Sequence, residues 1–395
     1  MTALSVDQAL ALVLGLAREP QPEQLALAEA RGRVLLADAV SQMTQPPFDA
    51  AAMDGYAVRR ADLPGPLRVV AEAAAGRGWD GTLGPGEAAR IFTGAPVPDG
   101  AELVVMQEDT TRDGDLVTVT VPQGRSNIRP RGNDFSAGDR VVAGRVLSAV
   151  DLALLAAMNV PQVTVGRRPR VAVLAGGDEL VAPGATPGPG QIISSNDLAV
   201  AALAREAGAE ARILPLARDT EASLREAFAA AAGADLVVTI GGASVGEHDL
   251  IARVAADLGM ERAFHRIAMR PGRPLMAGRL GDGAMLGLPG NPVSAIVTAV
   301  LFMQPLIRAT QGHAAPQPVV RHAALAGDLP PEGGRQHYLR AALREDGRGT
   351  VIAPFGDQDS ARLALLAQAD ALLVRPAGDP ARRAGELMQY IPLPR

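Results

Sequence analysis

The chain lacks two residue types altogether. It has no cysteine, and its 38 basic residues are all arginine, because no lysine occurs in the sequence. Without cysteine, disulfides, thiolate catalysis and zinc–sulfur sites are excluded. Without lysine, a Schiff base, a lysine general base and the GxxxxGKS or GxxxxGKT phosphate loop are excluded. Basic sites must therefore use arginine, which stays protonated and binds oxyanions through a planar fork.

An excess of positive charge is also missing. The formal net charge is −5, which argues against nucleic acid or an anionic membrane as a main partner. The first residues, MTALSVDQAL, have neither the basic region nor the apolar core of a signal peptide. We find no run of about 18 uncharged apolar residues. We therefore expect no membrane partner and a cytoplasmic protein.

The 395 residues, of which 48% are hydrophobic, are enough for roughly two to four domains. Short β runs broken by glycine and proline fill 67–121 and predict a small mixed β-rich domain. From Arg170 onward, strands alternate with helices, which indicates βαβ units and a parallel sheet. A long apolar helix is expected at Pro292–Arg308. Strand-like runs from Val319 predict a last small β domain.

The stretch Ala234–Asp249, ADLVVTIGGASVGEHD, has the order strand, glycine turn, helix start. Parallel sheets build binding sites at such carboxyl ends of strands. Gly242 and Ser244 could approach an anion closely, and Asp249 could cap the following helix or hold a metal. An ordinary Gly-Gly turn is the alternative interpretation.

Acidic residues stand in further turns between apolar runs. Each could be purely structural, as an Asp-Gly turn, a solvated strand end or a surface ion pair. Adjacent acids after a strand also suit Mg²⁺, which keeps phosphates and waters as its other ligands. The acidic turn residues are Asp54, Glu108, Asp134, Asp178 and Glu179, and Thr93 stands at a strand end in one of the same segments.

Two segments are candidates for binding anions. Arg270 and Arg273 lie in a rigid RPGRP turn, and GLPGNPVS (287–294) is a turn that opens into a helix. There Gly290, the free N–H groups beyond Pro292 and the Ser294 hydroxyl could face a ligand, with Asn291 as the cap. An ordinary capped helix is the alternative. The ensemble favours a phosphate-bearing ligand and a second oxyanion, bridged by a divalent metal.

Other enzyme classes lack their motifs. No GxGxxG follows a strand, as a dinucleotide dehydrogenase requires. No GxSxG elbow supports Ser244 or Ser294 as a hydrolase nucleophile. The histidines 248, 265 and 337 have no metal-ligand spacing.

Eight segments, in order along most of the chain, resemble the molybdopterin molybdenumtransferase family, which includes bacterial MoeA and the gephyrin E domain. They are AMDGYA (52–57), RIFTGAPVP (90–98), VVMQED (104–109), RGND (131–134), GDEL (177–180), GGASVGEHD (241–249), RPGRP (270–274) and GLPGNPVS (287–294).

The resemblance implies an elongated multidomain chain. A discontinuous first domain would comprise 1–40 and 138–168, with a mixed β-rich domain inserted at 41–137. An α/β molybdopterin-binding domain would span 169–316, and a C-terminal β domain 317–395. It also implies a homodimer in which the second domain of one subunit covers the third domain of the other.

The implied reaction joins molybdate to adenylylated molybdopterin and releases AMP with Mg²⁺, giving molybdenum cofactor. A molybdopterin adenylyltransferase would be a possible partner. Asp54, Thr93, Glu108 and Asp134 would line the cleft, Glu179 would position water, and Asp178 and Asp249 would hold the metal. Gly242, Ser244, Gly290 and Ser294 would donate hydrogen bonds to phosphate or molybdate, and Arg270 and Arg273 would neutralise charge.

The chain departs from the family pattern at Ala51, at Ala175-Gly176 and at Ser194, where the family usually has serine, Ser-Thr and aspartate. RPGRP replaces KPGKP, which keeps the charge. Two alternatives follow: a pterin- or nucleotide-binding paralogue with a different metal preference, and a dimeric scaffold without catalysis.

Overall fold

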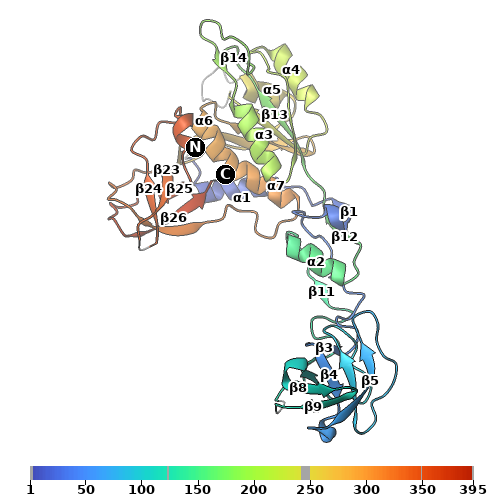
Figure 1. Cartoon of the computed structure of the whole chain (residues 1–395). Coiled ribbons are helices and arrows are strands. Elements are labelled where there is room, and N and C mark those ends of the chain that lie inside the picture. The colour runs from blue at the N-terminus through green and yellow to red at the C-terminus, as the bar shows by residue number, and fades with distance from the viewer. Residues whose placement is uncertain (1–2, 122–123, 242–249, 348, 394–395) are drawn as a thin grey trace.

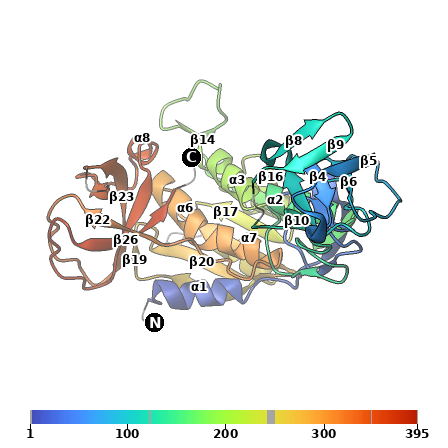
Figure 2. The ribbon, with the colours of Figure 1, turned by 60° about the horizontal axis from the view of Figure 1, so that its bottom comes forward.

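The structure is a computed structural model that describes residues 3–121, 124–241, 250–347 and 349–393. The chain is elongated: a β-rich domain at one end connects through a narrow middle region to an α/β domain and a second large sheet (Figure 1). Figure 2 shows the inserted domain and the C-terminal sheet on opposite sides of the α/β domain. The expected combination of a central α/β domain with β-rich domains is confirmed.

The inserted domain is built on a six-stranded sheet in the order β7-β4-β6-β5-β9-β8. Its small and β-branched residues alternate between two buried faces. The chain enters and leaves side by side, since Gln45 bridges Phe135. The elements are β3 (Ala50–Ala51), β4 (Gly55–Val58), η2 (Arg60–Asp62), β5 (Leu67–Ala73), β6 (Glu87–Ile91), β7 (Leu103–Met106), η3 (Gln107–Asp109), β8 (Thr110–Asp113), β9 (Leu116–Val119) and β10 (Ile128–Arg129).

The middle region joins two distant stretches of chain. β1 (Pro22–Ala26) pairs with β12 (Gln162–Gly166), and β2 (Ala39–Val40) pairs with β11 (Arg140–Val141), both antiparallel. Next to them lie η1 (Leu27–Glu29) and α2 (Ala149–Ala157), whose start is fixed by a capping box between Ser148 and Asp151.

The α/β domain has a six-stranded sheet in the order β16-β13-β17-β21-β20-β18. The first four strands are parallel, as expected, but β18 and β20 run antiparallel at the edge. No helix crosses over between β18, β20 and β21, so the chain returns through short connections. The strands are β13 (Arg170–Ala175), β16 (Glu210–Ile213), β17 (Leu236–Ile240), β18 (Glu261–Arg266), β20 (Pro274–Leu280) and β21 (Gly283–Leu288), beside a small pair, β14 (Leu180–Val181) and β15 (Ile192–Ile193).

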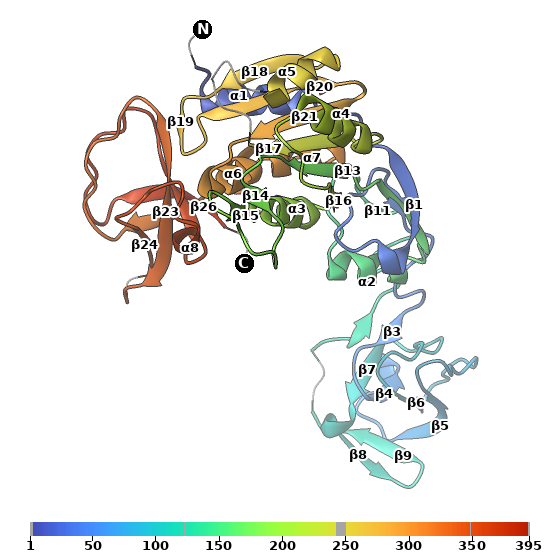
Figure 3. The same cartoon turned by 90° about the horizontal axis from the view of Figure 1, so that it is seen from above.

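Helices cover both faces of this sheet (Figure 3). α4 (Glu221–Ala230) and α5 (Leu250–Asp257) pack on one face, and α3 (Asn196–Glu206) packs on the other. The first helix, α1 (Val6–Leu14), begins with a capping box between Ser5 and Gln8 and packs its apolar side into the core on the α3 face.

The expected long apolar helix is divided into α6 (Pro292–Thr298), a π-helical stretch η4 (Ala299–Met303) and α7 (Gln304–Thr310). Pro305 has no N–H to donate, which explains a widened turn just before it. Pro292–Thr310 is long and apolar enough to cross a membrane by length and composition, a candidate that the sequence analysis did not single out. It lies 78% buried inside the molecule, as a core helix does.

The C-terminal sheet is attached directly to the α/β domain. Its order is β19-β23-β24-β22-β26-β25, and β19 (Met269–Arg270) comes from the RPGRP turn of the α/β domain. Tyr338, Leu372 and Ile391 share one hydrophobic core with Phe302. The other elements are β22 (Arg321–Leu325), β23 (Gln336–Glu345), β24 (Thr350–Pro354), α8 (Leu363–Leu366), β25 (Ala371–Arg375) and β26 (Leu387–Pro392), the last not expected from the sequence.

Candidate functional site

Asp54 and Thr93 meet at the edge of the inserted domain. Asp54 Oδ1 accepts hydrogen bonds from the Thr93 backbone N–H at 2.8 Å and from the Thr93 hydroxyl at 2.7 Å. These two bonds lower the pKa of Asp54, and the nearby Arg90 charge lowers it further against a small opposing effect of burial. The carboxylate is exposed, so it is a charged group available to a ligand.

Glu108 lies beside them in η3, directly after β7. The Gln107 backbone N–H donates to the Asp54 carbonyl at 3.1 Å, and the Gln107 amide donates to Glu108 Oε1 at 3.2 Å. Three of the predicted cleft residues therefore form one exposed cluster. Gln107, which links two of them, was not among the predicted site residues, although it stands in the VVMQED segment.

Asp134 lies apart, at the base of the inserted domain. Its backbone N–H donates to the Gln45 carbonyl at 3.0 Å, where the two connecting segments pair. Within the described residues, no hydrogen bond or ion pair connects Asp134 to the Asp54 cluster. Its exposed side chain thus occupies a separate position in this protomer.

In the α/β domain, three glycine turns meet where β13, β17 and β21 end. Gly241 has φ +86°, and a Cβ there would lie 3.4 Å from the Gly176 carbonyl oxygen. A Cβ on Gly290 would lie 3.6 Å from Gly241 Cα. Gly241 is required by its positive φ, whereas a Cβ at Gly241 or Gly290 would make only ordinary van der Waals contacts. The predicted residues Gly242, Ser244 and Asp249 lie outside the described residues.

Asp178 and Glu179 are exposed on the turn after β13. The Asp178 N–H donates to Asp219 Oδ2 at 3.3 Å, and the Asp219 N–H donates to Asp178 Oδ1 at 3.4 Å. Arg218 Nη1 lies 4.0 Å from Asp178 Oδ1. Asp219 was not predicted, although its place before the Thr220 cap of α4 puts it at the same edge of the sheet. The carboxylate of each aspartate is thus bound to the backbone N–H of the other.

The described residues contain no cluster of three or more histidine, aspartate or glutamate side chains suited to hold a metal. A pair of carboxylates still fits Mg²⁺, which usually binds one or two protein carboxylates together with substrate phosphates.

Asn196 adds an unexpected polar group near Gly290. Its amide donates to the Gly290 carbonyl at 2.7 Å, while its buried Oδ1 has no hydrogen-bond partner among the residues that the structure describes. Such an atom is costly to bury unless a ligand satisfies it. Ser194, one of the departures from the family pattern, turns inward instead and donates to Asp197 at 3.0 Å.

A pocket of about 780 Å³ opens next to these turns. Arg270 and Arg273 line it, with the buried Ser294. Arg335 of the C-terminal sheet also lines it and was not predicted. No carboxylate of the described residues forms an ion pair with any of these three arginines. Asp357 and Asp359 also line the pocket, but Asp357 pairs with Arg362 and Asp359 accepts from the Ala361 N–H. The three arginines are therefore left to bind a small oxyanion.

The loop 356–360 of the C-terminal domain lines this pocket. It also binds one of the helix-start N–H groups that were expected to be free. The Val293 N–H donates to the Ser360 carbonyl at 3.1 Å, so this helix-start donor is already occupied. Asn291 stands at the cap position but makes no side-chain cap bond, because its amide donates to Ser360 Oγ at 2.9 Å. The buried Arg340 holds the loop by donating to the Asp357 carbonyl at 3.2 Å.

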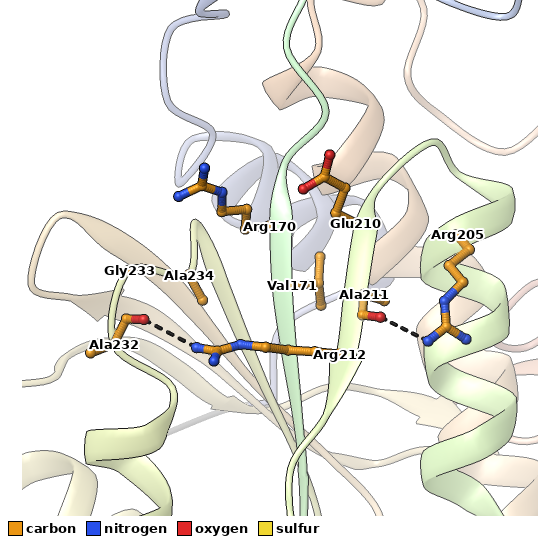
Figure 4. A pocket seen from close by; sticks show the side chains of 9 residues that line it. All are labelled: Arg170, Val171, Arg205, Glu210, Ala211, Arg212, Ala232, Gly233 and Ala234. Carbon is orange, nitrogen blue, oxygen red and sulfur yellow. Dashed lines mark hydrogen bonds between the residues drawn. The ribbon is translucent and has the colours of Figure 1, made fainter.

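Another pocket, of about 500 Å³, lies at the other end of the strands, where β13 and β16 begin (Figure 4). Arg205 donates to the Ala211 carbonyl at 2.7 Å, and Arg212 reaches across to the Ala232 carbonyl at 3.1 Å. The carboxyl ends of α3 and α4, with their partial negative charge, point to this end. These arginines therefore stabilise helix ends, and the site chemistry lies elsewhere.

Comparison with known proteins agrees with this geometry. Three family models match consecutively: the MoeA N-terminal region (domains I and II) at 4–159, the probable molybdopterin binding domain at 172–309 and the MoeA C-terminal region (domain IV) at 322–393. The chain belongs to the molybdopterin molybdenumtransferase (MoeA) family. This is a family of enzymes, and membership supports a role in molybdenum cofactor biosynthesis.

Relatives of the MoeA family cover nearly the whole chain. The molybdopterin molybdenumtransferase of a Nostoc species is 38% identical over 97% of this chain and 91% of its own length. Molybdopterin molybdenumtransferase 2 of Mycobacterium tuberculosis is 37% identical over 93% and 94%. The crystal structure of a molybdopterin biosynthesis MoeA protein from Pyrococcus horikoshii superposes with a TM-score of 0.83 at 30% identity, covering 99% of both chains.

Proposed function

We propose that this protein transfers molybdenum from molybdate to adenylylated molybdopterin, with Mg²⁺-dependent release of AMP, to give molybdenum cofactor. The observation that carries the proposal is the continuity of three features in the α/β domain. Glycine turns end the parallel strands, Asp178 and Asp219 are hydrogen-bonded to each other beside them, and an arginine-lined pocket opens at the start of α6. Cleavage of a phosphoanhydride needs N–H donors and a metal held by carboxylates, and binding of an oxyanion needs positive charge. The proposed reaction requires both at one place.

The arginine pocket fits the molybdate substrate. Molybdate is a compact dianion, and Arg270, Arg273 and Arg335 supply permanent positive charge with planar donor forks. The pocket also presents the hydroxyl-bearing residues Ser294 and Ser360. The arginines offset the cost of taking the dianion partly out of water, and they orient it by hydrogen bonds.

The region around Asp178 and Asp219 fits the adenylylated end of the pterin substrate. Asp178 and Asp219 would hold Mg²⁺, with Asp249 as a further ligand. When bound, Mg²⁺ supplies charge neutralisation to the phosphoanhydride. Glu179, exposed on the same turn, would accept a proton from the attacking water. Glycine N–H groups at the strand ends, with Gly242, Ser244 and Gly290, would hold phosphate oxygens, and Asn196 Oδ1 would accept from a pterin N–H group.

We also propose that the working unit is a homodimer. In one protomer, the Asp54 cluster and the glycine turns belong to domains at opposite ends of the molecule (Figure 1). Asp54, Thr93, Glu108 and Asp134 can complete a cleft at the turns only if they come from a second copy. The division of the chain at 1–40 with 138–168, 41–137, 169–316 and 317–395 belongs to the same proposal.

The proposal is tested with purified components. The protein is incubated with adenylylated molybdopterin, Mg²⁺ and molybdate, while AMP and the formed cofactor are measured. We expect AMP release that requires all three and is abolished by EDTA. Glu179→Gln should lower the rate on the order of 10²-fold, as loss of a transition-state contact does.

The matched control is Glu210→Gln, which changes an equally charged residue at the other end of the strands (Figure 4). It should leave AMP release unchanged. Absence of AMP release in the wild type, or equal effects of the two substitutions, would contradict the proposal. Replacing molybdate with tungstate in the same assay tests the paralogue with a different metal preference.

A further inference from the structure

Arg90 lies at the centre of the Asp54 cluster without being one of its predicted members. It stands on β6, directly opposite Tyr56 of β4 in the antiparallel register. One end of its guanidinium group, Nη1, donates to the Gly55 carbonyl at 3.1 Å. The other, Nη2, donates to Gln107 Oε1 at 2.6 Å. A single fork thus connects the turn after Asp54 with the η3 segment.

Aromatic rings fix the same guanidinium group in place. Its Cζ lies 5.1 Å from the centre of the Tyr56 ring and 4.7 Å from that of Phe92. Both distances are within the range of cation–π attraction. Phe92 directly precedes Thr93 in the chain, so the third segment of the cluster is also held by Arg90.

We propose that Arg90 is a positioning residue that holds Asp54, Thr93 and Glu108 in one arrangement for the reaction. The inference rests on the proposed function, because it assumes that these three side chains act on the substrate. A positive charge alone would not hold all three segments in place, because each is held by a different part of the guanidinium group: Nη1, Nη2 and its contact with the Phe92 ring. A planar group with several donors and two stacking faces can reach all of them.

A second arginine of the same sheet provides the contrast. Arg68 on β5 donates to Glu87 Oε1 at 2.8 Å, and its side chain is 66% exposed. Its hydrogen bond and ion pair link neighbouring strands and reach none of the three segments. Arg68→Ala therefore measures what an ordinary arginine contact contributes to this domain.

The experiment compares Arg90→Ala, Arg90→Lys and Arg68→Ala in the AMP-release assay. For Arg90→Ala we expect kcat to fall on the order of 10²-fold, because small misplacements of reacting groups have such effects. KM should change by less than about threefold, since the loss falls on the transition state. Arg90→Lys should stay at least about tenfold below the wild type, because lysine lacks the fork. Arg68→Ala should keep wild-type kcat.

Chemical rescue distinguishes positioning from a general structural role. In Arg90→Ala, added guanidinium at non-denaturing concentration should fill the space between the two rings and restore a measurable part of kcat, whereas added ammonium should not. Wild-type kcat in Arg90→Ala, full activity in Arg90→Lys, or loss of kcat in a folded Arg90→Ala that guanidinium does not restore would each overturn the inference.

Amide hydrogen exchange separates this inference from the proposed function. The Gln107 N–H, which donates to the Asp54 carbonyl, should exchange faster in Arg90→Ala and as in the wild type in Arg68→Ala. If the wild type releases no AMP, the proposed function fails, and unchanged Gln107 exchange would overturn the role of Arg90 as well. If the wild type is active and Arg90→Ala is too, only the inference about Arg90 fails.

Discussion

At the scale of single residues, Asp54 shows how local hydrogen bonds set a charge state. It is exposed, so solvent already favours its ionised form. The two Thr93 donors lower its pKa further from the ordinary value of 3.8. A carboxyl group with a lowered pKa keeps its charge above the ordinary value and loses it only as the pH falls through the lower, folded-state pKa. Between pH 5 and 9, activity should show no titration of Asp54.

Thr93→Val tests this cause directly. The substitution removes the hydroxyl donor and keeps the backbone N–H, which has the larger effect. We expect the pKa of Asp54 to rise part of the way toward 3.8, as measured by carboxyl carbon NMR. Thr120→Val, which removes a hydroxyl bonded to the Asp109 carbonyl, is the control. A pKa that stays unchanged in Thr93→Val would refute the role of the hydroxyl.

The departures from the family pattern also have residue-scale explanations. Ala51 is fully buried in the apolar core of the inserted domain, so no hydroxyl is presented there. Ala175 is buried at the end of β13, and Ser194 bonds inward to Asp197.

At the scale of elements, the RPGRP turn depends on close packing against α6. Gly272 has φ +98°, and a Cβ there would lie 2.5 Å from Thr298 Cγ2. The turn places Arg270 and Arg273 in the lining of the pocket of about 780 Å³. The position of both arginines therefore depends on a residue that has no side chain.

Gly272→Ala should destabilise the fold by about 1–3 kcal/mol from backbone strain, with an added cost from the clash. It should also weaken molybdate binding, measured by calorimetry. Gly281→Ala is the matched control, because Gly281 also has a positive φ (+55°) but has open space around its Cβ position. The double variant Gly272→Ala/Thr298→Ser should recover part of the binding. Equal effects of the two alanine substitutions would contradict the packing argument.

At the scale of the whole molecule, two groups of residues that the proposed reaction would need in one cleft lie far apart in a single chain. The Asp54 cluster and the glycine turns lie in different domains (Figure 1), while the C-terminal domain shares a core with the α/β domain and supplies Arg335 and Ser360. In the proposed homodimer, a site between two copies would remove this separation, and each subunit would contribute a different part.

Mixing two impaired variants tests the shared site. Asp54→Asn and Glu179→Gln chains, each strongly impaired alone, should regain activity when co-expressed, because a mixed dimer has one intact cleft. With random pairing we expect about a quarter of the wild-type rate. The control co-expresses wild type with the chain carrying both substitutions, whose mixed dimers have no intact cleft. No recovery in the first mixture would place the complete site within one chain.

The sequence determined much of this fold through local signals. Ser5 and Ser148 are local capping residues that start α1 and α2, and the alternation of strands and helices from Arg170 predicted the parallel part of the sheet. These features depend on neighbours in the chain, so periodicity and capping residues suffice. The eight segments likewise indicated the family, because their residue types and order along the chain are visible without coordinates.

Only the tertiary structure decided how distant segments meet. It brought Arg335 and Ser360 to the RPGRP turn, paired Asp178 with Asp219, and occupied the Val293 N–H that the sequence left free. It also brought the Arg90 guanidinium group within cation–π distance of the Tyr56 and Phe92 rings. Such contacts depend on which strands become neighbours and how closely glycine turns pack, and no pattern along the chain records either.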